Sequence, residues 1–117
     1  MALYAANNIA RAIETYRFNG VGLAGVVLNE RSDGIDRPLA QVYCETIGTS
    51  VLTTLHRDPQ ILEAERQGRT VIEHAPSSVT SKALRELSKV LIGMDLGGLS
   101  RPCPMSDHDF FRFLRSG

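Results

Sequence analysis

The spacing of apolar positions near the start of the chain predicts an amphipathic helix. These positions recur at steps of three to four residues and are Ala5, Ile9, Ile13 and Tyr16. Asn19-Gly20 supplies a stop signal. No Ser, Thr, Asp or Asn precedes Leu3, so the first amide groups of this helix lack the usual side-chain cap. We therefore expect a helix that starts abruptly, as in a chain cut inside a longer protein.

Two short apolar runs predict strands of a parallel sheet. Val21 to Leu28 is an almost unbroken apolar run that ends at Asn29, and Ser50 to Leu55 is rich in β-branched side chains. Runs of this length, bounded by turn residues, are typical of strands buried on both faces. Thr70-Val71-Ile72 is predicted as a third, shorter extended segment.

Helix signals follow each of the two runs. Arg31 to Gly34 predicts a loop, and a helix at 35–47 follows, with Pro38 in its first turn and Gly48 at its end. The apolar face of that helix comprises Ile35, Leu39, Val42, Tyr43 and Ile47. After the second run, Asp58 is the predicted cap of a helix that has Pro59 as its first residue and ends at Gln67-Gly68.

Two more helices are predicted in the last third of the chain. Ser77 or Ser78 caps the first of them and Ser106 caps the second. Their apolar positions are Ala83, Leu84, Leu87, Val90 and Leu91 in the first, and Phe110, Phe113 and Leu114 in the second.

Helices that alternate with apolar strands predict an α/β fold in which right-handed crossovers connect parallel strands. A parallel sheet needs cover on both faces and neighbouring strands at its edges, and two or three strands are too few for this. We therefore expect residues 1–117 to form a single partial domain, half of a larger sheet. Its exposed sheet edge predicts a tendency to aggregate.

The composition argues against several classes of partner. Thirteen basic and thirteen acidic residues give a formal net charge of zero, whereas nucleic-acid-binding proteins carry a basic surface. No apolar run is long enough to cross a bilayer, and the amino terminus lacks the pattern of a signal peptide. We expect a soluble, cytoplasmic protein with neither a nucleic-acid nor a membrane partner.

The cysteines and histidines do not predict a metal site. Cys44 and Cys103 lie far apart and form no C-x-x-C pair, so we expect free thiols, with Cys44 acting as a small apolar residue of its helix. His74 and His108 have no partner at metal-ligand spacing. We expect structural or solvent-exposed roles for both.

Two motif-like strings do not predict the chemistry that their letters suggest. Gly20 to Gly25 matches G-x-G-x-x-G, but these glycines follow a helix and lead into a strand, the reverse of a dinucleotide site. We expect them to serve a turn and a tight packing contact.

His56-Arg57-Asp58 lacks the downstream residues of a kinase catalytic loop. No G-x-x-x-x-G-K-[ST] phosphate loop occurs and no nucleophile has a suitable base, so no catalytic residue is predicted.

Polar residues at the ends of the two predicted strands are the candidate binding residues. Asn29 follows the first strand, and Arg57 and Asp58 follow the second. Ligands of open α/β sheets bind at this edge, so these three residues are candidates for nucleotide contact. Asp58 has a second interpretation, because a helix that starts at Pro59 needs a cap whether or not a ligand binds.

Several strings, in this order and spacing, together resemble the nitrogenase iron protein family. They are Met1 to Ile9 (MALYAANNI), Leu23 to Arg31 (LAGVVLNER), Arg57-Asp58, and Thr70 to Glu73 (TVIE). The resemblance covers nearly all 117 residues. It matches only the later part of that family's chain, where the opening string lies inside the protein. It implies a P-loop NTPase-like fold, with a doubly wound, mainly parallel sheet, whose phosphate-loop half is missing here.

The resemblance also implies an activity for the parent protein. Proteins of this family are homodimers that bind MgATP and hold one [4Fe-4S] cluster between their subunits. Hydrolysis of ATP gates electron delivery to a molybdenum–iron partner that reduces dinitrogen. Asn29, Arg57 and Asp58 match positions that border the adenine. The phosphate loop, the switch regions and the cluster cysteines belong to the missing portion, so this chain alone is expected to be inactive and to hold no metal.

The sequence departs from the family pattern at several places, and two alternatives stay open. His56 stands where the family usually has proline, Leu62 stands where it usually has a glutamine near the base, and the tail from Arg101 onward diverges most. One alternative is the iron protein of a protochlorophyllide or chlorophyllide reductase. The other is a stand-alone remnant that binds a partner or dimerises without doing chemistry.

Overall fold

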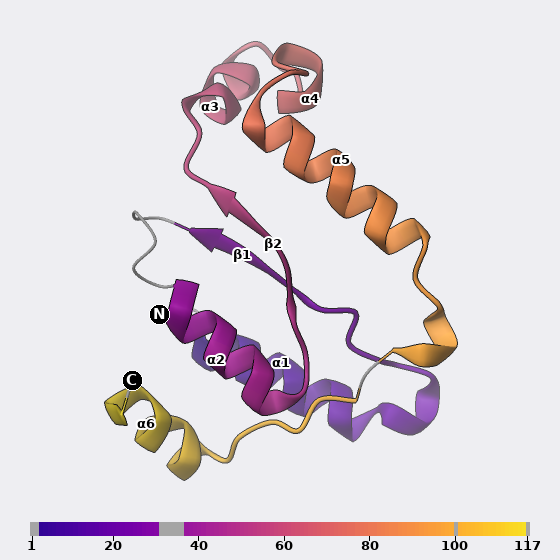
Figure 1. Ribbon diagram of the computed structural model, residues 1–117, viewed down its shortest axis with the longest axis vertical. Helices are drawn as coiled ribbons and strands as arrows, with labels where there is room; N and C mark the ends of the chain where they lie inside the picture. Colours follow the sequence, from indigo (N-terminus) through magenta and orange to yellow (C-terminus); the bar gives the residue numbers. More distant parts are fainter. Residues whose placement is uncertain (1–2, 31–36, 100, 117) are drawn as a thin grey trace.

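The computed structural model describes residues 3–30, 37–99 and 101–116, and two parallel strands lie at its centre (Figure 1). β1 (Val26–Glu30) pairs with β2 (Val51–His56), with Glu30 opposite His56. α2 (Arg37–Ile47) lies between them in the chain and contacts both strands. The predicted α/β class with parallel strands is confirmed. Because the strands are parallel, both carboxyl ends lie at the same edge of the sheet.

Helices lie on two sides of this pair of strands. Figure 1 shows α2 on one side, with α1 and α6 near it, and α5 running along the other side. Within the part of the chain that the structure describes, no helix is both long and apolar enough to span a bilayer. Besides α2, the helical elements are α1 (Leu3–Thr15), η1 (Arg17–Asn19), α3 (Pro59–Arg66), α4 (Val71–His74), α5 (Val79–Ile92), η2 (Leu96–Gly98) and α6 (Asp107–Ser116).

The main core of the molecule lies between α1, α2 and α6. Tyr43 and Phe110 are both fully buried there, with their rings edge-on and 6.2 Å apart. Phe113 and Leu114 pack against this cluster, so the predicted apolar face of the last helix is confirmed. Cys44 is buried in the same cluster, as expected for a small apolar residue. The buried residues of the cluster are Ala10, Tyr43, Cys44, Ile47, Met105 and Phe110.

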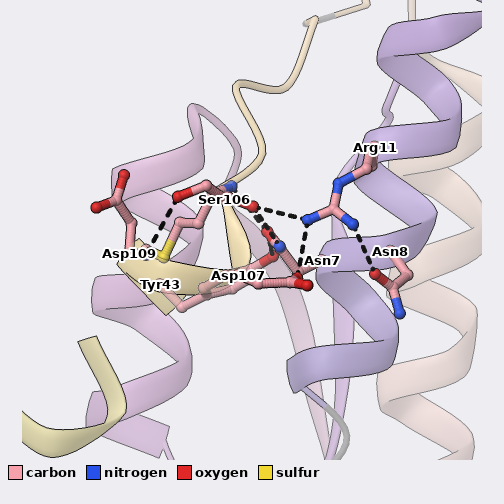
Figure 2. Close-up of polar contacts among 8 residues, drawn as sticks. Asn7, Asn8, Arg11, Tyr43, Ser106, Asp107 and Asp109 are labelled. Carbon is pink, nitrogen blue, oxygen red and sulfur yellow. Dashed lines mark hydrogen bonds and ion pairs between the residues drawn. The ribbon is translucent and has the colours of Figure 1, made fainter. Parts of the chain in front are cut away.

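Polar contacts tie the segment before α6 to α1 (Figure 2). Asn7 Nδ2 donates to the carbonyl of Met105 at 2.7 Å, and Arg11 Nη2 donates to the same carbonyl at 3.0 Å. Arg11 also forms an ion pair with Asp107 at 3.3 Å. These contacts join residues almost a hundred positions apart in the sequence, so they fix the end of the chain against its beginning.

The first strand differs from its prediction in two ways. It begins at Val26 and not at Val21, because Gly25 has a φ of +152° and lies so close to the Leu52 side chain that a Cβ would overlap it. The expected tight packing contact of the glycines is therefore made against a strand residue. Val27 is 42% exposed, so the expectation of burial on both faces was wrong. Val26 packs against the core, whereas its neighbour Val27 faces the other way.

The predicted third extended segment, Thr70 to Ile72, was also wrong. Thr70 Oγ1 accepts a hydrogen bond from the amide of Glu73 at 3.2 Å, and Glu73 Oε1 accepts one from the amide of Thr70 at 3.0 Å. This capping box starts the short helix α4 at Val71. Two reciprocal bonds of this kind outweigh the β preference of Val71 and Ile72. The sheet thus has two strands among the described residues.

The other predicted helix boundaries agree with the structure. Asp58 accepts from the amide of Gln60, and Ser78, not Ser77, accepts from the amide of Ser81. Ser106 Oγ accepts from the amide of Asp109 at 3.2 Å. Gly48 and Gly68 have φ values of +87° and +66° at the ends of α2 and α3. The predicted loop at 31–34 and Ile35 lie outside the described residues.

The predicted helix faces are less accurate than the helices themselves. In α1, Ile9 and Tyr16 are exposed, whereas Asn7 and Ala10 are buried. Val42 of α2 is exposed as well, and so are Val90 and Leu91 of α5. The buried face of α1 is the one that hydrogen-bonds to the segment before α6, and not the one that carries the large apolar side chains Ile9 and Tyr16.

The molecule is more open than a closed domain of its length. Its radius of gyration is 16.1 Å, whereas a compact chain of 117 residues has a radius of about 13 Å. Val79 and Ile92, at the two ends of α5, are 74% and 85% exposed. Large apolar side chains that stay exposed in this way leave part of the hydrophobic driving force unused.

Candidate functional site

The carboxyl ends of β1 and β2 open into a cavity of about 950 Å³. Its polar lining comes from the strand ends: Asn29 and Glu30 from β1, and His56, Arg57 and Asp58 from β2 and the turn after it. The first turns of α3 supply apolar side chains, among them Pro59, Ile61 and Leu62, and Glu65 completes the lining. The structure therefore brings the three predicted site residues, Asn29, Arg57 and Asp58, to one cavity.

Strand register explains why residues from distant parts of the sequence meet here. Asn29 is opposite Leu55, and Glu30 is opposite His56, so β1 and β2 end at the same level. The turn that carries Arg57 and Asp58 then leads directly into α3. Asn29 and Arg57 are both exposed at this edge, where a ligand can reach them.

Asp58 caps α3, and both of its carboxylate oxygens accept hydrogen bonds. Oδ1 accepts from the amide of Gln60 at 2.9 Å, and Oδ2 accepts from Thr80 Oγ1, on α5, at 2.7 Å. The hydroxyl of Thr80, followed by the amide of Gln60, holds the pKa of Asp58 below its ordinary value. The capping role is confirmed, while the nucleotide contact of Asp58 stays a prediction. Each oxygen keeps a lone pair for a further donor.

Arg57 lies between two cavities. It lines the one described above and a second, of about 380 Å³, on the side of Ser78 and Thr80 at the start of α5. Its guanidinium forms no ion pair or hydrogen bond with the described residues. A positive charge that is exposed and unpaired at a cavity is available to an anionic group of a ligand.

Glu30 is a buried charge at the edge of the cavity, and its side chain is 1% exposed. Oε2 lies 3.1 Å from Arg37 Nη2, at the start of α2, and 3.0 Å from His56 Nδ1. Glu30 Oε1 and Arg37 Nε are also buried and have no hydrogen-bond partner among the described residues. A buried carboxylate needs partners to offset its lost hydration, so this cluster is only half satisfied.

Glu30 is not among the site residues that the sequence predicts. It follows Asn29, where the predicted apolar run ends, and the alternation of strand side chains places Asn29 outward and Glu30 inward. Two signals were available: a carboxylate directly after Asn29, and the basic Arg37 at the start of the next helix. Neither signal says that the two side chains are buried or paired, because that depends on how α2 packs on the sheet.

The described residues do not fit an iron–sulfur cluster. Cys44 is buried in the core, and burial, with a smaller contribution from Glu45, raises the pKa of its thiol and so disfavours the thiolate that metals require. Cys103 is exposed and distant in sequence. His74 contacts Gln60 at 3.0 Å and His108 contacts Arg112 at 2.9 Å. Within the described ranges no group of three or more possible ligands gathers.

Comparison with known proteins decides the family. A family model described as "4Fe-4S iron sulfur cluster binding proteins, NifH/frxC family" matches residues 1–116. The chain belongs to this family. Membership implies a P-loop NTPase fold, and the parallel strands with an intervening helix agree with it.

A curated relative supports the same family. Nitrogenase iron protein 1 of Methanothermobacter thermautotrophicus is 39% identical over 93 residues, a match that covers 79% of this chain and 34% of the relative. The chain thus spans about a third of the length of the NifH/frxC relative that it matches. The resemblance on which the sequence analysis relied is confirmed.

Proposed function

We propose that this chain is the carboxy-terminal part of an ATP-dependent iron–sulfur electron-transfer protein, and that its cavity binds the adenine side of ATP. In the whole protein, a homodimer would couple ATP hydrolysis to electron delivery from a [4Fe-4S] cluster to a molybdenum–iron partner. The observation that carries the proposal is the meeting of Asn29, Arg57 and Asp58 at one cavity. These three residues were predicted from two separate strand ends.

The lining of the cavity suits a purine. The Asn29 amide both donates and accepts, so it can pair with adjacent donor and acceptor atoms on a purine edge. The carboxylate oxygens of Asp58 can accept a hydrogen bond from the exocyclic amino group of adenine. Ile61 and Leu62 of α3 offer apolar surface to the face of the ring. Arg57 adds an exposed positive charge at the same cavity, where it is available to an anionic group of the nucleotide.

In this proposal, the groups that hold the ATP phosphates and the cluster lie in the part of the parent protein that this chain does not contain. The chain contains no G-x-x-x-x-G-K-[ST] string, so it lacks the backbone cradle and lysine that hold ATP phosphates. The open shape and the exposed apolar ends of α5 fit a partial domain that packs against further protein. We expect the 117-residue chain to show neither ATP hydrolysis nor cluster absorbance after iron–sulfur reconstitution.

Calorimetric titration of the chain with ATP tests the nucleotide assignment. We expect a dissociation constant on the order of 1 mM, because only the adenine side is supported. Asn29→Ala should weaken binding about tenfold through loss of an amide that pairs with the base. Asn19→Ala, which removes an exposed amide that lines neither of the two cavities at the strand ends, is the matched control and should bind like the wild type. Absence of binding, or equal binding by Asn29→Ala, contradicts the proposal.

The sequence upstream of Met1 in the natural gene separates this function from its alternatives. A phosphate loop and two suitable cysteines there support an electron-transfer protein, and a gene that starts at Met1 supports a non-catalytic remnant. We propose a nitrogenase reductase, with the iron protein of a protochlorophyllide or chlorophyllide reductase as the alternative. Electron transfer from the complete protein to a purified molybdenum–iron partner would decide between these two.

A further inference from the structure

His56 connects the cavity to the buried charge beside it. Its ring is half exposed and lines both cavities at the strand ends. Its Nδ1 lies 3.0 Å from Oε2 of the buried Glu30, which is the residue directly opposite it in the sheet. His56, the last residue of β2, thus contacts a buried carboxylate at the end of β1.

The contacts of the ring define how His56 is held. With its proton on Nδ1, His56 donates to Glu30 Oε2, and Nε2 faces Arg37 Nη2 at 3.4 Å as a weak acceptor. The Nδ1 contact is the stronger one, because it is shorter and its acceptor is a buried carboxylate. The Glu30 side chain is 1% exposed, so water could replace His56 as its partner only if the buried carboxylate became exposed.

The turn after β2 is therefore held from two sides. On the side of α2, His56 donates to Glu30, and on the side of α5, Asp58 accepts from Thr80 at 2.7 Å. Arg57 lies between these two anchors and forms no ion pair of its own with the described residues. The direction in which Arg57 leaves the backbone depends on its two neighbours.

We propose that His56 is a positioning residue: its hydrogen bond to the buried Glu30 carboxylate fixes the Arg57–Asp58 turn and so presents Arg57 to the cavity. The proposal rests on the proposed function only in the role it gives to Arg57 as a ligand contact.

Backbone ¹⁵N relaxation of the ligand-free chain tests the proposal. The order parameters of the Arg57 and Asp58 amides should be near 0.85 in the wild type and should fall below about 0.6 in His56→Ala. His56→Asn keeps a donor at the place of Nδ1, so it should restore the wild-type values. Glu30→Met removes the acceptor at similar length and should reproduce the loss. His108→Ala, which changes an exposed histidine on α6, is the control and should leave the turn unchanged.

Hydrogen exchange of the β2 amides in the same samples shows whether the sheet is intact in each variant. An intact sheet with an equally ordered turn in His56→Ala overturns the proposal, and so does a turn in His56→Asn that is as mobile as in His56→Ala. Loss of the sheet itself in His56→Asn also overturns it, because the retained donor should hold the strand ends together. No nucleotide is present in this experiment, so a failure of ATP binding would count against the proposed function and not against this one.

Discussion

Asn7 and Glu30 are both buried polar residues, but their hydrogen-bonding groups are satisfied to different degrees. Asn7 Nδ2 donates to Met105, and Oδ1 accepts from Tyr43 Oη at 2.8 Å and from the amide of Met105 at 3.0 Å (Figure 2). Burial, more than the nearby Cys44, raises the pKa of Tyr43 to about 12, so its hydroxyl stays protonated and donates. Glu30, in contrast, has one buried oxygen that accepts no hydrogen bond from the part of the chain that the structure describes.

This difference separates a structural region from a candidate site. The network around Asn7 joins α1, α2 and the segment before α6, and both Asn7 and Tyr43 are fully buried. The cluster of Glu30, Arg37 and His56 lies at the strand ends beside a cavity of about 950 Å³. A buried polar group that no neighbouring side chain satisfies can take its partner from water or a ligand in the cavity, so the two regions should respond differently to substitution.

The largest expected effect is that of Asn7→Ala. Removal of the amide leaves the Tyr43 hydroxyl and the Met105 amide group without partners in a buried place, whereas the Met105 carbonyl keeps its bond from Arg11. The free energy of unfolding should fall by about 3 kcal/mol, because each buried unsatisfied group costs about 1–3 kcal/mol. Urea titration followed by circular dichroism measures this change.

Asn8→Ala is the matched control for that measurement. Asn8 is exposed on the same helix and accepts one bond from Arg11 at 3.3 Å, so its loss should cost less than about 0.5 kcal/mol. Equal destabilisation by the two variants would mean that the network around Asn7 is not the special feature of this region.

Glu30→Gln should have a smaller effect. The glutamine keeps an acceptor for His56 and fits the same space, and Arg37 is exposed enough to be solvated. The loss of the charge should lower the free energy of unfolding by about 1 kcal/mol, as for one hydrogen bond. A cost as large as that of Asn7→Ala, measured by the same urea titration, would show that the cluster at the cavity is as structural as the network around Asn7.

Thr80→Val should have the smallest effect on stability, about 0.5 kcal/mol for one lost hydrogen bond. The pKa of Asp58 should rise toward its ordinary value, because the Thr80 hydroxyl is the main cause of its depression. The wild type is therefore more stable than Thr80→Val at neutral pH, and this difference disappears as the pH falls through the depressed pKa of Asp58. Carboxyl ¹³C shifts followed against pH measure the change, and an unaltered pKa of Asp58 would refute this assignment.

Local signals were sufficient to predict most helices and the parallel sheet. Asp58-Pro59, Ser78 and Ser106 mark helix starts through bonds made within one turn, which a sequence displays directly. The same kind of signal was overlooked at Thr70, where the glutamate three residues later completes a capping box.

Long-range features could not be predicted in the same way. The burial of Asn7 depends on Met105, 98 residues away, so the apolar stripe of Ile9 and Tyr16 indicated the wrong face of α1. At the candidate site, the meeting of Asn29, Arg57 and Asp58 at one cavity could be predicted because parallel strands end at a common edge, while their contact with a nucleotide stays a prediction. The pairing of Glu30 with Arg37 and His56 depends on how α2 packs, which no local pattern contains.

Amide chemical-shift mapping of the ¹⁵N-labelled chain during titration with ATP tests the central assignment most directly. The account predicts shifts that concentrate on Asn29, Arg57, Asp58 and Leu62, with none at Phe110 in the core between α1, α2 and α6. GTP, which presents a carbonyl where adenine has an amino group, should cause smaller shifts at the same residues. Shifts spread over α1 and α6, or none at the cavity at ATP concentrations on the order of 10 mM, would contradict it.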